Sequence, residues 1–305
     1  MLKTLLSFFA LGAIILLAPD QALAWGPGVH LAVGNSLLAQ THLLTPFLSE
    51  LFTAHRQAFL YGCLSADIFI GKGTKFRPGH SHNWDTGFRL LESVHDPRLM
   101  AYAYGYISHL AADTVAHNLF VPAMLTVAPS GGTASHVYVE MLADQKVGWD
   151  RRQASRVLNR AEIAADDLLL AAMQRAKLPF LLKKNLMRSG LFLCRQVPWD
   201  ISLDLASRLL PAGDFAQFLD DMVSLSLRAV VDVFERPLDS PALEMDPIGS
   251  RNLEQARRMR RSCGRRFASF EPEQTFPVPA CLAGLPLLPP TPDVLPVLAV
   301  STDRH

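Results

Sequence analysis

Three side chains that commonly bind metal ions recur at intervals of four residues within one apolar segment. They are His109, Asp113 and His117, and small residues such as Ala111 and Ala112 stand between them. Residues four apart on an α-helix share one face, so the three would line a single stripe. Burying three polar groups in such surroundings costs free energy unless a partner satisfies them. The spacing therefore predicts a metal-binding helix.

A second segment has the same four-residue spacing of candidate metal ligands. His136 and Glu140 are again four residues apart, and imidazole and carboxylate groups are both zinc ligands. Asp67 stands upstream in a largely apolar stretch, where an unpaired carboxylate would be costly to bury. His82 follows, and its neighbour His80 is an alternative ligand at this point. These residues extend the predicted metal site beyond one helix.

The predicted donor atoms are nitrogen and oxygen rather than sulfur. The chain has four cysteines but no Cys-x-x-Cys, which argues against thiolate zinc sites and thioredoxin-like redox chemistry. Imidazoles with carboxylates suit zinc or a similar divalent ion at a hydrolytic site. The candidates outnumber the four ligands of one tetrahedral ion, which favours several ions sharing bridging carboxylates.

The elements that must position these residues are helices. Apolar residues recur at i, i+3 and i+4 through most of the chain, and alternating strand-like stretches are scarce, so we predict an all-α fold. The predicted helices run over 29–38, 46–63, 84–94, 98–116, 135–146, 150–175, 178–194 and 215–234. Glycine- and proline-rich breaks fall at 71–79, 129–132 and 211–213.

The first 24 residues are typical of a secretory signal peptide. Lys3 precedes an apolar stretch, and Ala22 and Ala24 form an A-x-A cleavage site. Such a segment would direct export to the periplasm or outside the cell. Cleavage after Ala24 would then make Trp25 the new N-terminus. An uncleaved membrane anchor is the alternative. In an exported protein the four cysteines could form two disulfides by any of three pairings, or remain four buried thiols.

Composition narrows the class of protein further. Half of the 305 residues are hydrophobic, which excludes a disordered chain, and the formal net charge of +1 gives no general field for binding nucleic acid. We predict one helical domain over 25–270, followed by a proline-rich, extended tail over 271–305. A basic cluster precedes the tail, and it is either a solvated helix face or a site for anionic headgroups. Its members are Arg257, Arg258, Arg260, Arg261, Arg265 and Arg266.

The ordered candidates resemble the ligands of the zinc-dependent phospholipase C family, whose fold is shared by the S1/P1-type single-strand nucleases. The series that carries the resemblance is Trp25, His30, Asp67, His82, His109, Asp113, His117, His136 and Glu140. The resemblance spans 25–146 and implies a helical domain with three zinc ions, one of them held by the amino group and carbonyl of an N-terminal Trp. The predicted cleavage site falls immediately before that Trp, which is an independent agreement.

The resemblance also implies how the ligands are shared. By analogy, Asp67, His82, His109 and Asp113 would hold one zinc. His117, His136 and Glu140 would hold a second, while Trp25 and His30 would hold the third with Asp113 as the bridge. Glu140 matches the phospholipases, where the nucleases have Asp. The spacing from Asp113 to His117 is tighter than in the bacterial phospholipases.

The activity that the resemblance implies is hydrolysis of a phosphodiester, that of a phospholipid at a membrane surface. Asp67 is the catalytic candidate, as the base that accepts a proton from the attacking water. A single-strand nuclease is the rival, and it would need aromatic residues such as Trp84, Tyr106 or Tyr138 at the site to stack bases. A metal-stabilised binding protein without activity is a third alternative. Motifs of serine lipases and zincin proteases are absent, and no protein partner is implied.

Overall fold

A computed structural model describes the fold over residues 25–69, 80–127, 133–160, 162–196, 215–263 and 272–288. Within these ranges the regular elements are all helices, so the predicted all-α class is confirmed. The predicted signal peptide, the three glycine- and proline-rich breaks and the last residues of the tail lie outside the described residues.

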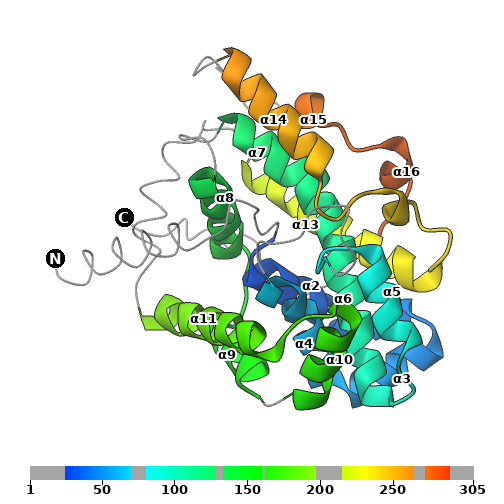
Figure 1. The fold of residues 1–305 in the computed structure, drawn as a ribbon. Coiled ribbons are helices and arrows are strands. Elements are labelled where there is room, and N and C mark those ends of the chain that lie inside the picture. Colours follow the sequence, from blue (N-terminus) through cyan, green and yellow to red (C-terminus); the bar gives the residue numbers. More distant parts are fainter. Residues whose placement is uncertain are drawn as a thin grey trace, which may run out of the picture.

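The elements in chain order are α2 (Pro27–Ala39), η1 (Thr41–Leu43), α3 (Pro46–Ala54), α4 (Arg56–Ser65), η2 (Ala66–Phe69), α5 (Trp84–Glu92), α6 (Pro97–Val115), η3 (Ala116–Phe120), α7 (Val121–Val127), α8 (Thr133–Lys146), α9 (Arg151–Asn159), α10 (Ile163–Met173), α11 (Lys177–Gln196), α13 (Phe215–Glu235), η4 (Pro241–Glu244), α14 (Ser250–Cys263), α15 (Pro272–Thr275) and α16 (Ala280–Ala283). Figure 1 shows their arrangement.

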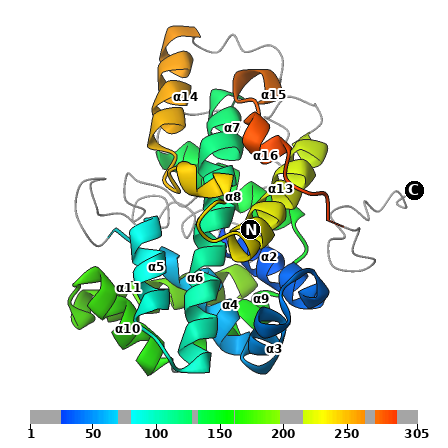
Figure 2. The same ribbon diagram turned by 90° about the vertical axis from the view of Figure 1, so that its right-hand side faces the viewer.

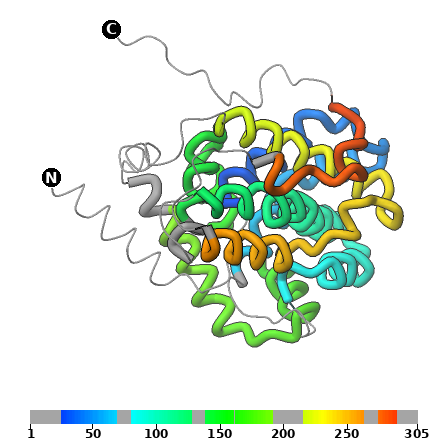
Figure 3. Tube along the Cα trace, turned by 90° about the horizontal axis from the view of Figure 1, so that it is seen from above, coloured from blue at the N-terminus to red at the C-terminus, as the bar shows by residue number. Residues whose placement is uncertain are grey.

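One long helical rod, formed by α6, η3 and α7, runs through the middle of the molecule (Figure 2). Asp96 caps its start by accepting a hydrogen bond from the Leu99 N–H, and Pro97 occupies the first turn. The rod is long and apolar enough to cross a membrane, but 94% of its apolar window is buried inside the protein. Helices α4, α5 and α13 pack directly on α6, and Figure 3, a view from above, shows α13 (yellow) and α5 (cyan) on different sides of the rod. Its apolar character is therefore that of a core helix.

Two glycines let α4 approach α6 at very short range. A Cβ on Gly62 would lie 2.1 Å from the Tyr102 carbonyl oxygen, and one on Gly105 would lie 2.0 Å from the Phe59 carbonyl oxygen. Any side chain at either position would force the helices apart. The close crossing matters for the site, because it brings the backbone of α4 against His109 on α6.

The central rod contains one π-helical turn, η3, at Ala116–Phe120. There the Val121 N–H bonds to the Ala116 carbonyl, five residues back. The loop after η4 and the first turn of α14 support this turn: Asn118 Nδ2 donates to the Asp246 carbonyl (2.8 Å), and Asn252 Nδ2 donates to the Asn118 carbonyl (2.7 Å). Gly249 has a φ of +61°, and a Cβ there would lie 2.2 Å from the His117 carbonyl oxygen. π-helical turns like η3 are rare and often occur at functional sites.

Several predicted boundaries were wrong. The helix predicted over 46–63 is two helices, because His55 leaves the helical conformation between α3 and α4. The helix predicted over 150–175 divides into α9 and α10, and α10 ends where Gln174 adopts a left-handed conformation, with φ of 52°. Helix α7 was not predicted, whereas α14 carries most of the basic cluster, for which a solvated helix face was one of the two interpretations. On α14, Arg258 and Arg261 pair with Glu254 at the protein surface.

The tail and the cysteines also differ from expectation. Residues 272–288 are not extended: α15 begins at Pro272 and α16 follows Pro279, which suits proline at a helix start. Buried side chains there, including Leu282, attach this part to the domain. Cys63 is a buried free thiol and Cys281 an exposed one, which excludes both the two-disulfide arrangement and four buried thiols. The side chains of Cys194 and Cys263 lie outside the described residues.

Candidate metal centre

Four buried side chains from two elements and one loop bring their ligand atoms together: Asp67 on η2, His109 and Asp113 on α6, and His82 in the loop before α5. Nε2 of His82 lies 3.3 Å from Oδ1 of Asp67 and 3.2 Å from Oδ2 of Asp113. Nε2 of His109 lies 3.6 Å and 3.2 Å from the same two oxygens. The two Nε2 atoms are 3.1 Å apart. Tetrahedral zinc with bonds of about 2.0–2.1 Å separates neighbouring ligand atoms by roughly 3.3 Å, so the spacings around the two imidazole nitrogens are those of zinc ligands. Asp67, His82 and His109 form one set of donor atoms close enough to hold a metal ion.

Asp113 faces a second group of ligands with its other oxygen. Its Oδ1 lies 3.2 Å from Nε2 of His30, and the His30 ring stacks on the His109 ring with centroids 3.7 Å apart. His30, His109 and Asp113 form a second set of donor atoms close enough to hold a metal ion. A carboxylate whose two oxygens serve different imidazoles is placed to bridge two ions.

Hydrogen bonds behind the two central imidazoles orient them. His109 Nδ1 lies 2.9 Å from the Cys63 carbonyl, which can only accept, so the neutral ring carries its proton on Nδ1 and presents the Nε2 lone pair to the site. The close crossing of α4 and α6 supplies that carbonyl. His82 Nδ1 lies 2.9 Å from Ser81 Oγ, and Tyr106 donates to the Ser81 carbonyl. Such outer contacts are typical of metal-bound histidines.

The structure separates His80 from His82. His82 is buried and points at the carboxylates, whereas Nδ1 of His80 accepts the backbone N–H of His82 at 3.0 Å. The His80 carbonyl in turn accepts the Thr86 hydroxyl. His80 thus shapes the loop before α5, and His82 occupies the ligand position.

The buried negative charges of this cluster favour binding of a cation. Asp67 and Asp113 are completely buried, and among the described residues neither receives a hydrogen bond of good geometry. Burial by itself would lower the pKa of His82, but the carboxylates of Asp113 and Asp67 outweigh burial and raise that pKa to about 10. Burial would raise the pKa of Asp113, yet His109 and His30 hold it well below its usual range. Buried carboxylates without donors, beside imidazoles, are suited to a divalent metal ion.

Of the remaining predicted ligands, His117 and Glu140 lie near this core. The His117 ring lies 6.5 Å from the His82 ring, and burial lowers the pKa of His117 to about 4, so its imidazole is neutral. Glu140 is buried on α8, where burial and then the charges of Asp67 and Asp113 raise its pKa well above the usual range. His136 belongs to the same helix, but its side chain lies outside the described residues.

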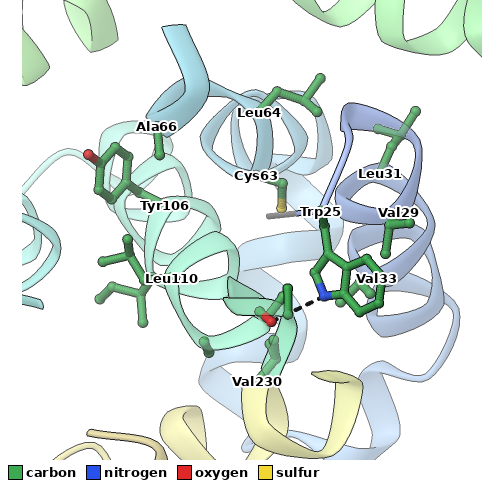
Figure 4. Close-up of a cluster of buried hydrophobic side chains, with 14 of the residues drawn as sticks. Trp25, Val29, Leu31, Val33, Cys63, Leu64, Ala66, Tyr106, Leu110 and Val230 are labelled. Carbon is green, nitrogen blue, oxygen red and sulfur yellow. Dashed lines mark hydrogen bonds between the residues drawn. The ribbon is translucent and has the colours of Figure 1, made fainter. Parts of the chain in front are cut away.

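Trp25 is held by its indole ring. The ring is buried between α2, α6 and α13 (Figure 4). Its Nε1 donates to the Ala112 carbonyl (3.2 Å) and to Ser226 Oγ (3.1 Å). Ala112 immediately precedes Asp113, so these bonds fix residue 25 beside the cluster.

Sequence reasoning missed Asp144, which holds the start of α2. Its Oδ2 and Oδ1 accept the backbone N–H groups of Gly28 and Val29, both at 2.9 Å. A Cβ on Gly26 would lie 2.4 Å from Asp144, and one on Gly28 would lie 2.6 Å from the ring of Trp149. The available signal was the continuation of the i, i+4 series from His136 and Glu140 to Asp144. This carboxylate links α8 to the helix that carries His30.

Replacing Asp144 with Ala should therefore lower the free energy of unfolding by about 2 kcal/mol, the upper end of the range for a helix cap, because two inward-facing N–H groups lose their acceptor. Urea denaturation measures this change. Asp150 is the matched control, since its more exposed carboxylate caps α9 through the Arg152 N–H, and Asp150→Ala should cost about 0.5–1 kcal/mol. Equal losses in the two variants would contradict the role given to Asp144.

The fold and the site together define an all-α metal-binding protein whose ligands come mainly from α2, η2 and α6. Comparison with known families identifies the family: the model described as zinc dependent phospholipase C matches residues 29–182, about half of the chain. The chain belongs to this family. No curated protein and no solved structure matches it.

Proposed function

We propose that this chain is an exported phospholipase C that hydrolyses the phosphodiester of phospholipids at a membrane surface, with up to three zinc ions. The observation that carries the proposal is the buried pair His82 and His109, whose Nε2 atoms lie at zinc-ligand spacing from each other and from the carboxylates of Asp67 and Asp113. Family membership adds the reaction class. The second oxygen of Asp113, facing His30, supports a further ion.

The residues have separate tasks in the proposed reaction. Bound zinc would neutralise phosphate oxygens and lower the pKa of the attacking water. His82 and His109 present oriented nitrogens, and the high pKa of His82 means that a cation must displace a proton to bind there. Asp67 accepts the proton that the attacking water loses. Its buried position keeps bulk water away from this carboxylate.

The proposed third ion depends on processing before Trp25. An α-amino group has a pKa near 8, so a cation can readily compete for its lone pair. Adding one residue before Trp25 in the mature protein should therefore remove about one zinc equivalent and leave the others. Metal analysis of the two proteins measures this loss. Equal zinc contents would refute the assignment of the N-terminus as a ligand.

Substrate class is tested by assaying the zinc-loaded mature protein in parallel on phosphatidylcholine vesicles and on single-stranded DNA. We expect release of phosphocholine and no cleavage of DNA. One candidate base-stacking residue is unsuited to the nuclease role, because Tyr106 is fully buried and donates to the Ser81 carbonyl. Turnover of DNA alone would overturn the proposal in favour of a nuclease.

A further inference from the structure

Helix α11 exposes an unusual amount of apolar surface. Phe47, Ile163, Leu238 and Leu287 are exposed singly elsewhere, but four exposed leucines gather on α11. Leu178, Leu181, Leu182 and Leu186 are 72%, 40%, 65% and 57% exposed. At 100° per residue they cover an arc of about 140° on one side of the helix. We call these four residues the leucine face.

The opposite side of α11 is anchored in the protein, so the leucine face must point outward. Phe180, Lys184 and Leu191 are buried there. Lys184 Nζ lies 2.6 Å from Oδ2 of Asp166 on α10 and 4.8 Å from the ring centroid of Tyr61 on α4. An ion pair in which both side chains are buried fixes the rotation of the helix, because breaking it would leave an uncompensated charge inside the protein.

Basic residues border the leucine face on both sides. Lys183 lies along one edge, and Lys177 and Arg188 lie along the other. Residues 177–196 contain no Asp or Glu. Helix α9 packs beside α11 (Figure 1). It adds the exposed side chains of Arg152 and Arg160, and that of Arg156, which pairs with Asp150. Leucines between long basic side chains are typical of helices that lie in the headgroup region of a bilayer.

We propose that the leucine face docks the protein on a bilayer that carries anionic phospholipids. The positive charge on α9 and α11 favours an anionic bilayer as the partner, because anionic headgroups attract Lys and Arg while the leucines enter the acyl boundary. The basic helix α14 lacks this combination, because its described side chains include no exposed large apolar residue. Helix α11 also packs against η2, which carries Asp67. Docking there would bring the metal centre close to lipid, and this consequence alone rests on the proposed function.

The test is the binding of the zinc-loaded protein, on ice, to sedimenting vesicles made of equal parts phosphatidylglycerol and phosphatidylcholine. The double variant Leu182→Ser/Leu186→Ser should bind about tenfold more weakly, because two leucines lose their apolar contact with lipid. The control double variant Leu238→Ser/Leu287→Ser, which alters exposed leucines elsewhere, should bind like the wild type. Vesicles of phosphatidylcholine alone, or high salt, should weaken binding by the wild type.

Three results would overturn the proposal. Equal binding by the wild type and the α11 variant would show that the leucine face does not meet lipid. A lower melting temperature in that variant would show that another segment of the chain covers the face, and a change in molar mass by light scattering would show self-association. Hydrolysis of short-chain phosphatidylcholine monomers tests the proposed function separately: its failure, with vesicle binding intact, would refute the activity and not the docking surface.

Discussion

Replacing Asp113 with Asn should abolish most zinc binding and lower kcat/KM by about a thousandfold or more. The carboxylate contacts His30 through one oxygen and both His82 and His109 through the other. An amide has no charge and only one acceptor oxygen, so it cannot serve both sides. Metal-ion stabilisation of a transition state is worth several kcal/mol, and about 1.4 kcal/mol corresponds to each tenfold in rate. Metal analysis and phosphodiester hydrolysis measure the two effects.

The matched control is Asp85→Asn, which makes the same chemical change at an exposed position three residues after His82. This variant should keep full zinc content and activity. Unchanged zinc in Asp113→Asn would disprove the bridging role, while a similar loss in both variants would point to general damage of the fold.

Removing zinc with a chelator should lower the melting temperature by roughly 10 °C and stop hydrolysis. Ligand present at a thousandfold its Kd stabilises a protein by about 4 kcal/mol, and for a domain of this size each kcal/mol moves the melting temperature by about 2–4 °C. Calorimetry with and without chelator measures the shift, and added zinc should restore it. Identical melting curves would mean that the cluster binds no metal that matters for folding.

The size of this shift should depend on pH. The pKa of His82 in the fold is about 10, above its ordinary value of 6.5, so its protonated form contributes stability that is complete below pH 6.5 and is lost as pH rises toward 10. Zinc needs the neutral ring and binds better as protons are removed. The gap between zinc-loaded and chelated melting temperatures should therefore widen from pH 6.5 upward. A gap that narrows would contradict this balance of charges.

Periodicity predicted the helices that are amphipathic or uniformly apolar, and it failed where local geometry depends on distant contacts. The ranges of α2, α5 and α6 followed from apolar spacing. The π turn after Val115 could not, because it is supported by Asp246, Gly249 and Asn252, more than a hundred residues away. This turn adds a backbone residue at His117, the ligand candidate whose spacing from Asp113 is tight.

The site was predictable where it follows from local sequence pattern, and not where it depends on contacts made in the fold. Residue types and i, i+4 spacing pointed to His109 and Asp113, and burial of Asp67 followed from its apolar neighbours. The choice of His82 over His80 needed coordinates, since it depends on which ring turns toward the carboxylates. Asp144 continues the i, i+4 series of His136 and Glu140, but its role was missed because its partners, the backbone N–H groups of Gly28 and Val29, lie more than a hundred residues away.

The contacts of residues 246–252 with the π turn bear on whether the ligand-bearing part of this protein can be separated from the rest. The matched family region, residues 29–182, contains every candidate ligand except Trp25. It lacks Asn252, which donates to the Asn118 carbonyl, and Asp246, whose carbonyl accepts a hydrogen bond from the Asn118 side chain. A fragment limited to residues 29–182 would therefore lose the hydrogen bonds that support the π turn. We therefore expect the ligand-bearing region to need the carboxy-terminal helices for a stable fold.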